Sequence, residues 1–288
     1  MKVTLALAVA TLAFVNLELP RLDSRGSHGR AADTSLLDRH LLVTWYGNPH
    51  SREMGVLGRA EGAQRASSLR EQAAAYVPLT SKQVLPAYHL VAVVAQATAG
   101  MDGKWRRRES SEMILSLLQE ARSFGFGLVL DVQPGRSAIE DELAFLRPFL
   151  VEPDVHLALD PEFDMSEGQR PGRELGHMHA SDVNAALDVL EQVLSSAELP
   201  PKVLIVHQFK LSMLPDKEKI RPRPRIDLVL DMDGFGSRSL KLATYRTVMR
   251  QGRLPFAGFK LFYRQDTNLF EPADVMRLTP TPSVVIYQ

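Results

Sequence analysis

Leu128–Gln133 reads LVLDVQ and Val155–Phe163 reads VHLALDPEF. Both stretches are nearly continuous apolar runs that end in polar residues, without the alternation of a half-exposed strand. Parallel strands that are covered on both faces have this composition. Between them, Ser137–Leu150 has a helical pattern, and Ser137 followed by Glu140 predicts a capping box at its start. The region therefore predicts a strand–helix–strand unit.

The same pattern extends over the rest of the chain. Helical patterns fill most gaps, although three prolines between Lys210 and Arg225 exclude a long helix there. Eight such strands, with no glycine-rich G-x-G-x-x-G turn after the first, favour a closed (β/α)₈ TIM-like barrel over an open sheet. We expect the eighth helix to be missing or replaced by the segment before Leu41. The other six strands are expected at Leu41–Tyr46, Leu90–Gln96, Val203–Phe209, Ile226–Asp233, Gly258–Tyr263 and Ser283–Tyr287, and the other helices at Ala63–Val77, Ser110–Phe124, Ser181–Ala197, Ser237–Arg250 and Glu271–Leu278.

The composition is that of one folded domain, which we place at residues 36–288. The chain has 288 residues, of which 45% are hydrophobic, enough for one sizeable core. Its 34 basic and 34 acidic residues cancel, so no net field attracts nucleic acid or an acidic membrane surface. The absence of cysteine excludes thiolate nucleophiles, iron–sulfur clusters and disulfides.

The first residues have the pattern of a signal peptide. Lys2 precedes the apolar run Val3–Val15, which is too short to cross a bilayer. We expect a signal peptide at residues 1–20, a linker at 21–35, and processing before Leu36, which predicts a secreted or cell-envelope protein. The alternative is a buried helix or strand of the mature fold. No other stretch predicts an integral membrane segment.

Polar side chains close most of the predicted strands. In a parallel barrel these ends meet on one face, where barrel enzymes have their active sites. Residues at i and i+2 of a strand share a face, so carboxylates there can crowd, raise one another's pKa and leave an acid beside a base. The alternative is that strand-end aspartates only cap the following turns. The predicted catalytic residues are Glu162, Asp160, Asp131, Asp231 and His207, and the predicted substrate-binding residues are Trp45, Tyr46, His50, Gln96, Gln133, Arg136, Asp233, Lys260 and Tyr263.

The segment LALDPEF, Leu157–Phe163, resembles the strand-four region of secreted glycoside-hydrolase barrels. The lysozyme-like muramidases and the chitinase-like clan place an Asp-x-Glu pair at the end of an apolar strand, and here that pair is Asp160 and Glu162. The series of acids that precedes the glutamate in the chitinase-like clan is absent, because apolar residues occupy those positions. Three blocks also resemble those of a bacterial exported family, a likeness that implies no activity: WYGNP (45–49), LDVQPGRS (130–137) and LDPEF (159–163).

The resemblance implies hydrolysis of a glycosidic bond in a polysaccharide or cell-wall glycan. In that case Glu162 is the proton donor, Asp160 tunes it, and Asp131 or Asp231 is the partner carboxylate. The expected partner is a carbohydrate or another small-molecule substrate, and no cofactor is needed. Aromatic rings can stack on sugar faces, and the candidates are Trp45, Tyr46 and Tyr263.

Two alternatives remain open. Carboxylates and histidines are also the ligands of divalent metals, so a metal-dependent, phosphodiesterase-like hydrolase is the second hypothesis. A barrel that binds glycan without catalysis is the third. Under the metal hypothesis the ligand set is His50, Asp131, Asp160, Glu162, His207 and Asp231.

Overall fold

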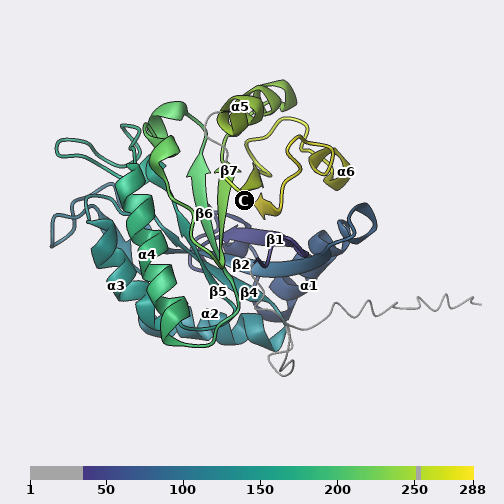
Figure 1. The fold of residues 1–288 in the computed structure, drawn as a ribbon, viewed down its shortest axis with the longest axis horizontal. Coiled ribbons are helices and arrows are strands. Elements are labelled where there is room, and N and C mark those ends of the chain that lie inside the picture. Colours follow the sequence, from purple (N-terminus) through teal and green to yellow (C-terminus); the bar gives the residue numbers. More distant parts are fainter. Residues whose placement is uncertain (1–34, 251–253) are drawn as a thin grey trace, which may run out of the picture.

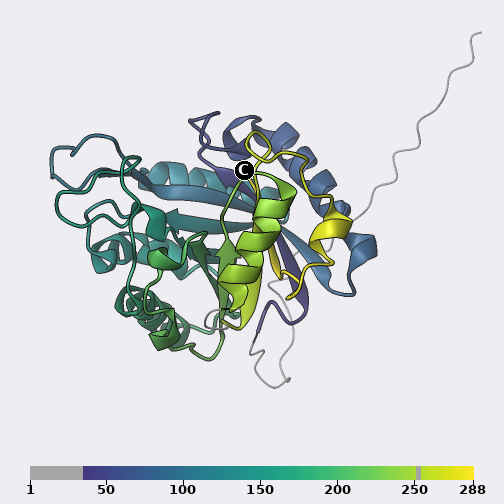
Figure 2. The same cartoon turned by 90° about the horizontal axis from the view of Figure 1, so that it is seen from above.

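The computed structural model describes residues 35–250 and 254–288. Eight parallel strands form a closed barrel surrounded by helices, as the sequence predicts (Figures 1 and 2). The barrel closes because the first strand pairs with both the second and the last. A ninth strand, β3 (Arg106–Arg108), pairs antiparallel with the end of the second. In chain order the barrel strands are β1 (His40–Gly47), β2 (Gln83–Ala95), β4 (Gly127–Val132), β5 (Val155–Leu159), β6 (Lys202–Gln208), β7 (Ile226–Met232), β8 (Phe256–Leu261) and β9 (Val284–Tyr287).

Helices occupy most of the gaps between strands. As the prolines predict, the connection from β6 to β7 has only two short 3₁₀ turns, Leu211–Met213 and Lys217–Lys219. The last helix is a single turn, shorter than the eight residues expected at Glu271–Leu278. The helices are α1 (Gly62–Ala74), α2 (Ser111–Ser123), α3 (Ile139–Leu150), α4 (Ala180–Ser196), α5 (Arg238–Arg250) and α6 (Pro272–Val275), and the other 3₁₀ turns are Val56–Gly58, Val77–Leu79 and Pro161–Phe163. No helix in the described ranges is long and apolar enough to cross a membrane.

Helix starts follow the sequence only in part. Ser110 is the N-cap of α2, and its hydroxyl accepts a backbone hydrogen bond from the first turn of the helix. The capping box predicted from Ser137 and Glu140 is wrong, because α3 begins one residue later than it requires, after Ala138. The backbone N–H of Ser137 instead donates to the carbonyl of Pro134 at 3.0 Å, which places this residue in the preceding turn.

The apolar side chains form two cores, one between the barrel and its helices and one inside the barrel. Successive residues of a strand point to opposite faces, so Trp45 packs in the outer core and Tyr46 in the inner one. Small and β-branched side chains fill the middle of the barrel, among them Ala87, Val129, Ala158, Ile205, Val229 and Ile286. The polar residues near the C-terminal ends of the strands therefore lie above a packed apolar core.

The segment before β1 closes the N-terminal end of the barrel. Leu37 is fully buried within the inner core. One carboxylate oxygen of Asp227 accepts hydrogen bonds from the backbone N–H groups of Leu36 and Leu37, each at 2.7 Å. Leu36 and Leu37 thus cover the bottom of the barrel. The signal peptide and most of the linker predicted for residues 1–35 lie outside the described residues.

Candidate active site

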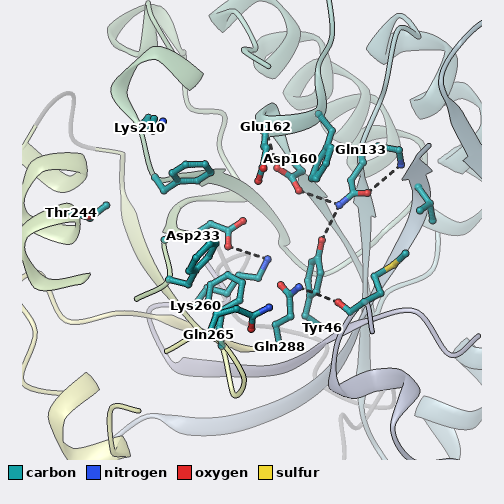
Figure 3. A pocket seen from close by; sticks show the side chains of 18 of the residues that line it. Tyr46, Gln133, Asp160, Glu162, Lys210, Asp233, Thr244, Lys260, Gln265 and Gln288 are labelled. Carbon is teal, nitrogen blue, oxygen red and sulfur yellow. Dashed lines mark hydrogen bonds and ion pairs between the residues drawn. The ribbon is translucent and has the colours of Figure 1, made fainter. Parts of the chain in front are cut away.

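A cavity of about 700 Å³ opens where the C-terminal ends of the barrel strands meet (Figure 3). Its floor is polar and its walls are largely aromatic. Sites of this kind, concave and mostly apolar with a few converging polar groups, are the usual form of a small-molecule site. The polar lining includes Tyr46, Gln133, Asp160, Glu162, Asp233, Lys260, Gln265 and Gln288, and the aromatic walls are Phe163, Phe209, Phe235 and Phe262.

Asp160 and Glu162 reach the cavity through a turn. The strand was expected to run to Phe163, but β5 ends before Asp160, whose side chain caps the 3₁₀ turn Pro161–Phe163. Asp160 Oδ1 accepts the backbone N–H of Glu162 at 3.2 Å, and Asp160 Oδ2 accepts a hydrogen bond from Gln133 Nε2 at 3.3 Å. The proline that follows Asp160 ends the strand, and the turn places both acids in the cavity.

Lys260 forms a buried ion pair with Asp233. The Lys260 Nζ atom lies 3.1 Å from Asp233 Oδ1 and 3.7 Å from the centre of the Tyr46 ring. Burial opposes the charge on Lys260, but Asp233 and the neighbouring carboxylates outweigh it and raise the pKa of the ammonium group. Lys260 is therefore a fixed cation and not a nucleophilic amine.

The three acids of the cavity hold protons more tightly than free carboxyl groups. Burial raises the pKa of Glu162, and the charge of Asp233 adds to this effect. Burial also raises the pKa of Asp160 well above its ordinary value. Asp233 has a raised pKa through burial as well, although Lys260 favours its ionised form. Of the three acids, Asp233 is the one whose carboxylate lies against the Lys260 ammonium group, which leaves Glu162 as a candidate proton donor.

Three predicted catalytic residues do not line this cavity. Asp131, His207 and Asp231 are completely buried, so the expectation that they open into one cleft with Glu162 is wrong. Asp131 and Asp231 lie two residues before Gln133 and Asp233, which directly follow the ends of β4 and β7 and line the cavity instead.

The buried layer is a charged cluster that also contains His89 of β2. His207 Nδ1 lies 2.9 Å from Asp231 Oδ2, and its Nε2 lies 3.4 Å from Asp131 Oδ2. His89 Nε2 lies 3.7 Å from the same Asp131 oxygen. The ring of Tyr46 stands 5.0 Å from that of His89 and 6.1 Å from that of His207, between the cluster and the cavity.

The two histidines of the cluster have opposite charge preferences. Burial lowers the pKa of His89 to about 4, so its imidazole is neutral at neutral pH. Burial acts in the same direction on His207, but the carboxylates of Asp131 and Asp231 outweigh it and raise the pKa well above the ordinary value. Of these two adjacent imidazoles, His89 therefore favours the neutral form and His207 the charged form.

Four of the nine predicted substrate-binding residues line the cavity, namely Tyr46, Gln133, Asp233 and Lys260. Trp45 does not, because it faces the outer core. Tyr263 points away as well, and its hydroxyl donates to Gln72 at 2.7 Å.

The remaining three candidates lie in the loops. His50 is exposed and belongs to neither of the His/Asp groups whose donor atoms converge, so its predicted role as a metal ligand is not supported. Gln96 donates to the carbonyl oxygens of Val94 and Ala95. The guanidinium of Arg136 donates to the carbonyl of Gln169.

Sequence reasoning missed His89 and the phenylalanine walls. The strand around His89 was expected to begin at Leu90, but it begins at Gln83 and includes Pro86. A strand that tolerates one proline would have included His89. Phe209 and Phe235 follow the ends of β6 and β7, where polar residues were expected to form the site.

No protein-family model matches the chain, and no curated protein matches it. Its function must be inferred from the chemistry of the cavity.

Proposed function

We propose that the protein hydrolyses a glycosidic bond, with Glu162 as the general acid. The observation that carries the proposal is the pairing of Glu162 with the Asp233–Lys260 ion pair in one cavity. The carboxyl groups of Glu162 and Asp233 point into the same space in Figure 3. Glycoside hydrolysis needs one protonated and one ionised carboxyl group at the scissile bond.

The chemistry assigns a role to each group. Glu162 gives its proton to the leaving oxygen as the glycosidic C–O bond breaks, and a water molecule supplies the hydroxyl that completes hydrolysis. Asp233, held beside Lys260, is the second carboxylate, which attacks the anomeric carbon or activates the water. Asp233 takes the place of Asp131 and Asp231, the partner acids first expected, because both are covered. Asp160 fixes the turn that carries Glu162.

The walls and floor of the cavity suit a carbohydrate. Phenylalanine rings offer apolar faces to the C–H groups of a pyranose, and Phe235 at the rim is 60% exposed. The amides of Gln265 and Gln288 can donate to and accept from sugar hydroxyls. This combination of apolar faces and neutral amides supports a sugar more than a phosphate ester, which requires more cations.

The test is the activity of Glu162→Gln on panels of aryl-glycosides and polysaccharides. We expect the substitution to lower the rate about 10²–10⁴-fold, because a positioned acid contributes that much. Glu167→Gln is the matched control, since Glu167 is exposed in the following loop and should keep full activity. Wild-type rates in Glu162→Gln would remove this residue from the mechanism. Sugar binding without turnover by the wild type would favour the non-catalytic alternative.

A further inference from the structure

The cluster beneath the cavity floor has buried polar atoms that no described residue satisfies. His89, Asp131 and His207 come from β2, β4 and β6, and all three side chains are completely buried. Within the described ranges, the Nε2 atoms of both histidines and both carboxylate oxygens of Asp131 lack a hydrogen-bond partner. Leaving a buried polar atom unpaired costs about 1–3 kcal/mol, and native structures contain few such atoms. Three of the four atoms face one another at 3.4 and 3.7 Å, too far apart for good hydrogen bonds, so the cluster is a candidate site for a ligand.

The other ring nitrogens show which way the histidines face. His207 Nδ1 bonds to Asp231 Oδ2 at 2.9 Å, and His89 Nδ1 lies 3.4 Å from Thr44 Oγ1. Both rings therefore direct Nε2 toward Asp131. Metal-binding histidines have this arrangement, with one nitrogen on the metal and the other held by a carboxylate or another polar group.

The spacing of the donor atoms fits one ion. Asp131 Oδ2 lies 3.4 Å from His207 Nε2 and 3.7 Å from His89 Nε2, and all three donors lie within 4.8 Å of one another. Ligands at about 2.0–2.1 Å from a tetrahedral zinc ion are roughly 3.3 Å apart. The two donor pairs that include Asp131 Oδ2 need to contract by only a few tenths of an ångström around an ion.

We propose that His89, Asp131 and His207 bind a divalent transition-metal ion of the zinc class. Two imidazoles and a carboxylate are a ligand set that such ions prefer. The two positive charges of the ion match the carboxylates of Asp131 and Asp231. Tyr46 and the other floor residues lie between these ligands and the cavity, so the proposed ion site is separate from the substrate space. The inference therefore does not depend on glycosidase activity.

A second group of donors, His207, Asp231 and Asp233, also converges. It is the weaker candidate, because Asp233 already holds the ammonium of Lys260 at 3.1 Å. His207 Nδ1 would also have to leave Asp231 to bind an ion there. The first group needs neither change.

The experiment measures metal in the full-length protein. Metal content is determined in protein as isolated and in protein unfolded with a chelator and refolded with Zn²⁺, since the site is buried. We expect one tightly bound ion per chain, and Co²⁺ in its place should give the absorption bands of a nitrogen–oxygen site. His89→Gln and Asp131→Asn should each weaken Zn²⁺ binding more than 100-fold, and Asp231→Asn about 10–100-fold.

Two controls separate this site from other histidines. His156→Gln alters another buried histidine of the barrel, whose Nδ1 accepts the backbone N–H of Val203 at 3.2 Å, and should keep the ion. The double variant His177→Gln/His179→Gln removes two neighbouring loop histidines and should also keep it. Refolded wild-type protein without stoichiometric metal would overturn the proposal. Zn²⁺ binding that survives Asp131→Asn but is lost in His177→Gln/His179→Gln would also overturn it. Circular dichroism verifies that each variant folds.

Discussion

Gly258 on β8 pairs with Asp231 on β7 so closely that a Cβ atom at position 258 would lie 2.6 Å from Asp231 Oδ1. The missing side chain makes room for the carboxylate that holds His207. The glycine is thus part of the construction of the buried cluster, although it donates no group to it.

Gly258→Ala should therefore destabilise the protein by about 1–3 kcal/mol, the usual cost of overpacking a core. Urea unfolding of the wild type, of Gly258→Ala, of Asp231→Ala and of the double variant measures this cost. The two single effects should add only in part, because Asp231→Ala removes Oδ1, the atom nearest the new methyl group, although Asp231 Cβ and Cα remain 2.9 and 3.0 Å from it. Strict additivity would mean that the Asp231 carboxylate contributes nothing to the cost of the Gly258→Ala substitution.

Lys260→Met should destabilise the protein by about 3–5 kcal/mol, because it leaves Asp233 as a buried charge without its partner. The double variant Lys260→Met/Asp233→Asn should recover part of the loss. Lys219→Met removes an exposed lysine 3.6 Å from Asp216 and should cost less than about 1 kcal/mol. Equal losses for the buried and the exposed lysine in thermal unfolding would contradict the description of the Lys260 pair.

The sequence predicted the barrel because parallel strands buried on both faces have an unmistakable apolar composition. It could not predict the depth of each polar residue. Asp131 and Gln133 were correctly expected to share a face, as were Asp231 and Asp233. Which member of each pair reaches the cavity depends on the stagger between strands, which a single strand does not encode.

Two further errors have equally local causes. Trp45 and Tyr46 were both named as sugar-stacking candidates, although adjacent residues of a strand face opposite sides and only one can point inward. Asp160 and Glu162 were placed together for the wrong reason, since a turn and not the strand pleat joins them. The LDPEF segment lies at the cavity, where Asp160, Glu162 and Phe163 are part of the lining.

Asp164 should make the protein less stable as pH rises. Burial, with a contribution from Asp182, raises the pKa of Asp164 from 3.8 to about 7. The unfolded chain loses this proton near pH 4, whereas the folded chain keeps it until about pH 7, so folding becomes less favourable across that interval. Asp164→Asn removes the effect and should raise Tm by roughly 2–4 °C at pH 8, with little change at pH 4.

Glu167→Gln is the control for this comparison, because it removes an acidic group that is exposed in the same loop. A gain from Asp164→Asn that is the same at pH 4 and pH 8 would show that it does not arise from this proton.

The rate of glycoside hydrolysis should fall as pH rises through the pKa of Glu162. A general acid acts only while protonated, and burial together with Asp233 holds this pKa above the ordinary value of 4.5. The positive charge of Lys210, also in the cavity lining, acts in the opposite direction. Lys210→Met should therefore move the alkaline limb of the kcat profile to higher pH, whereas Lys210→Arg, which keeps the charge, should leave it in place. A limb that moves to lower pH in Lys210→Met, or that persists in Glu162→Gln, would assign the titrating proton to another group.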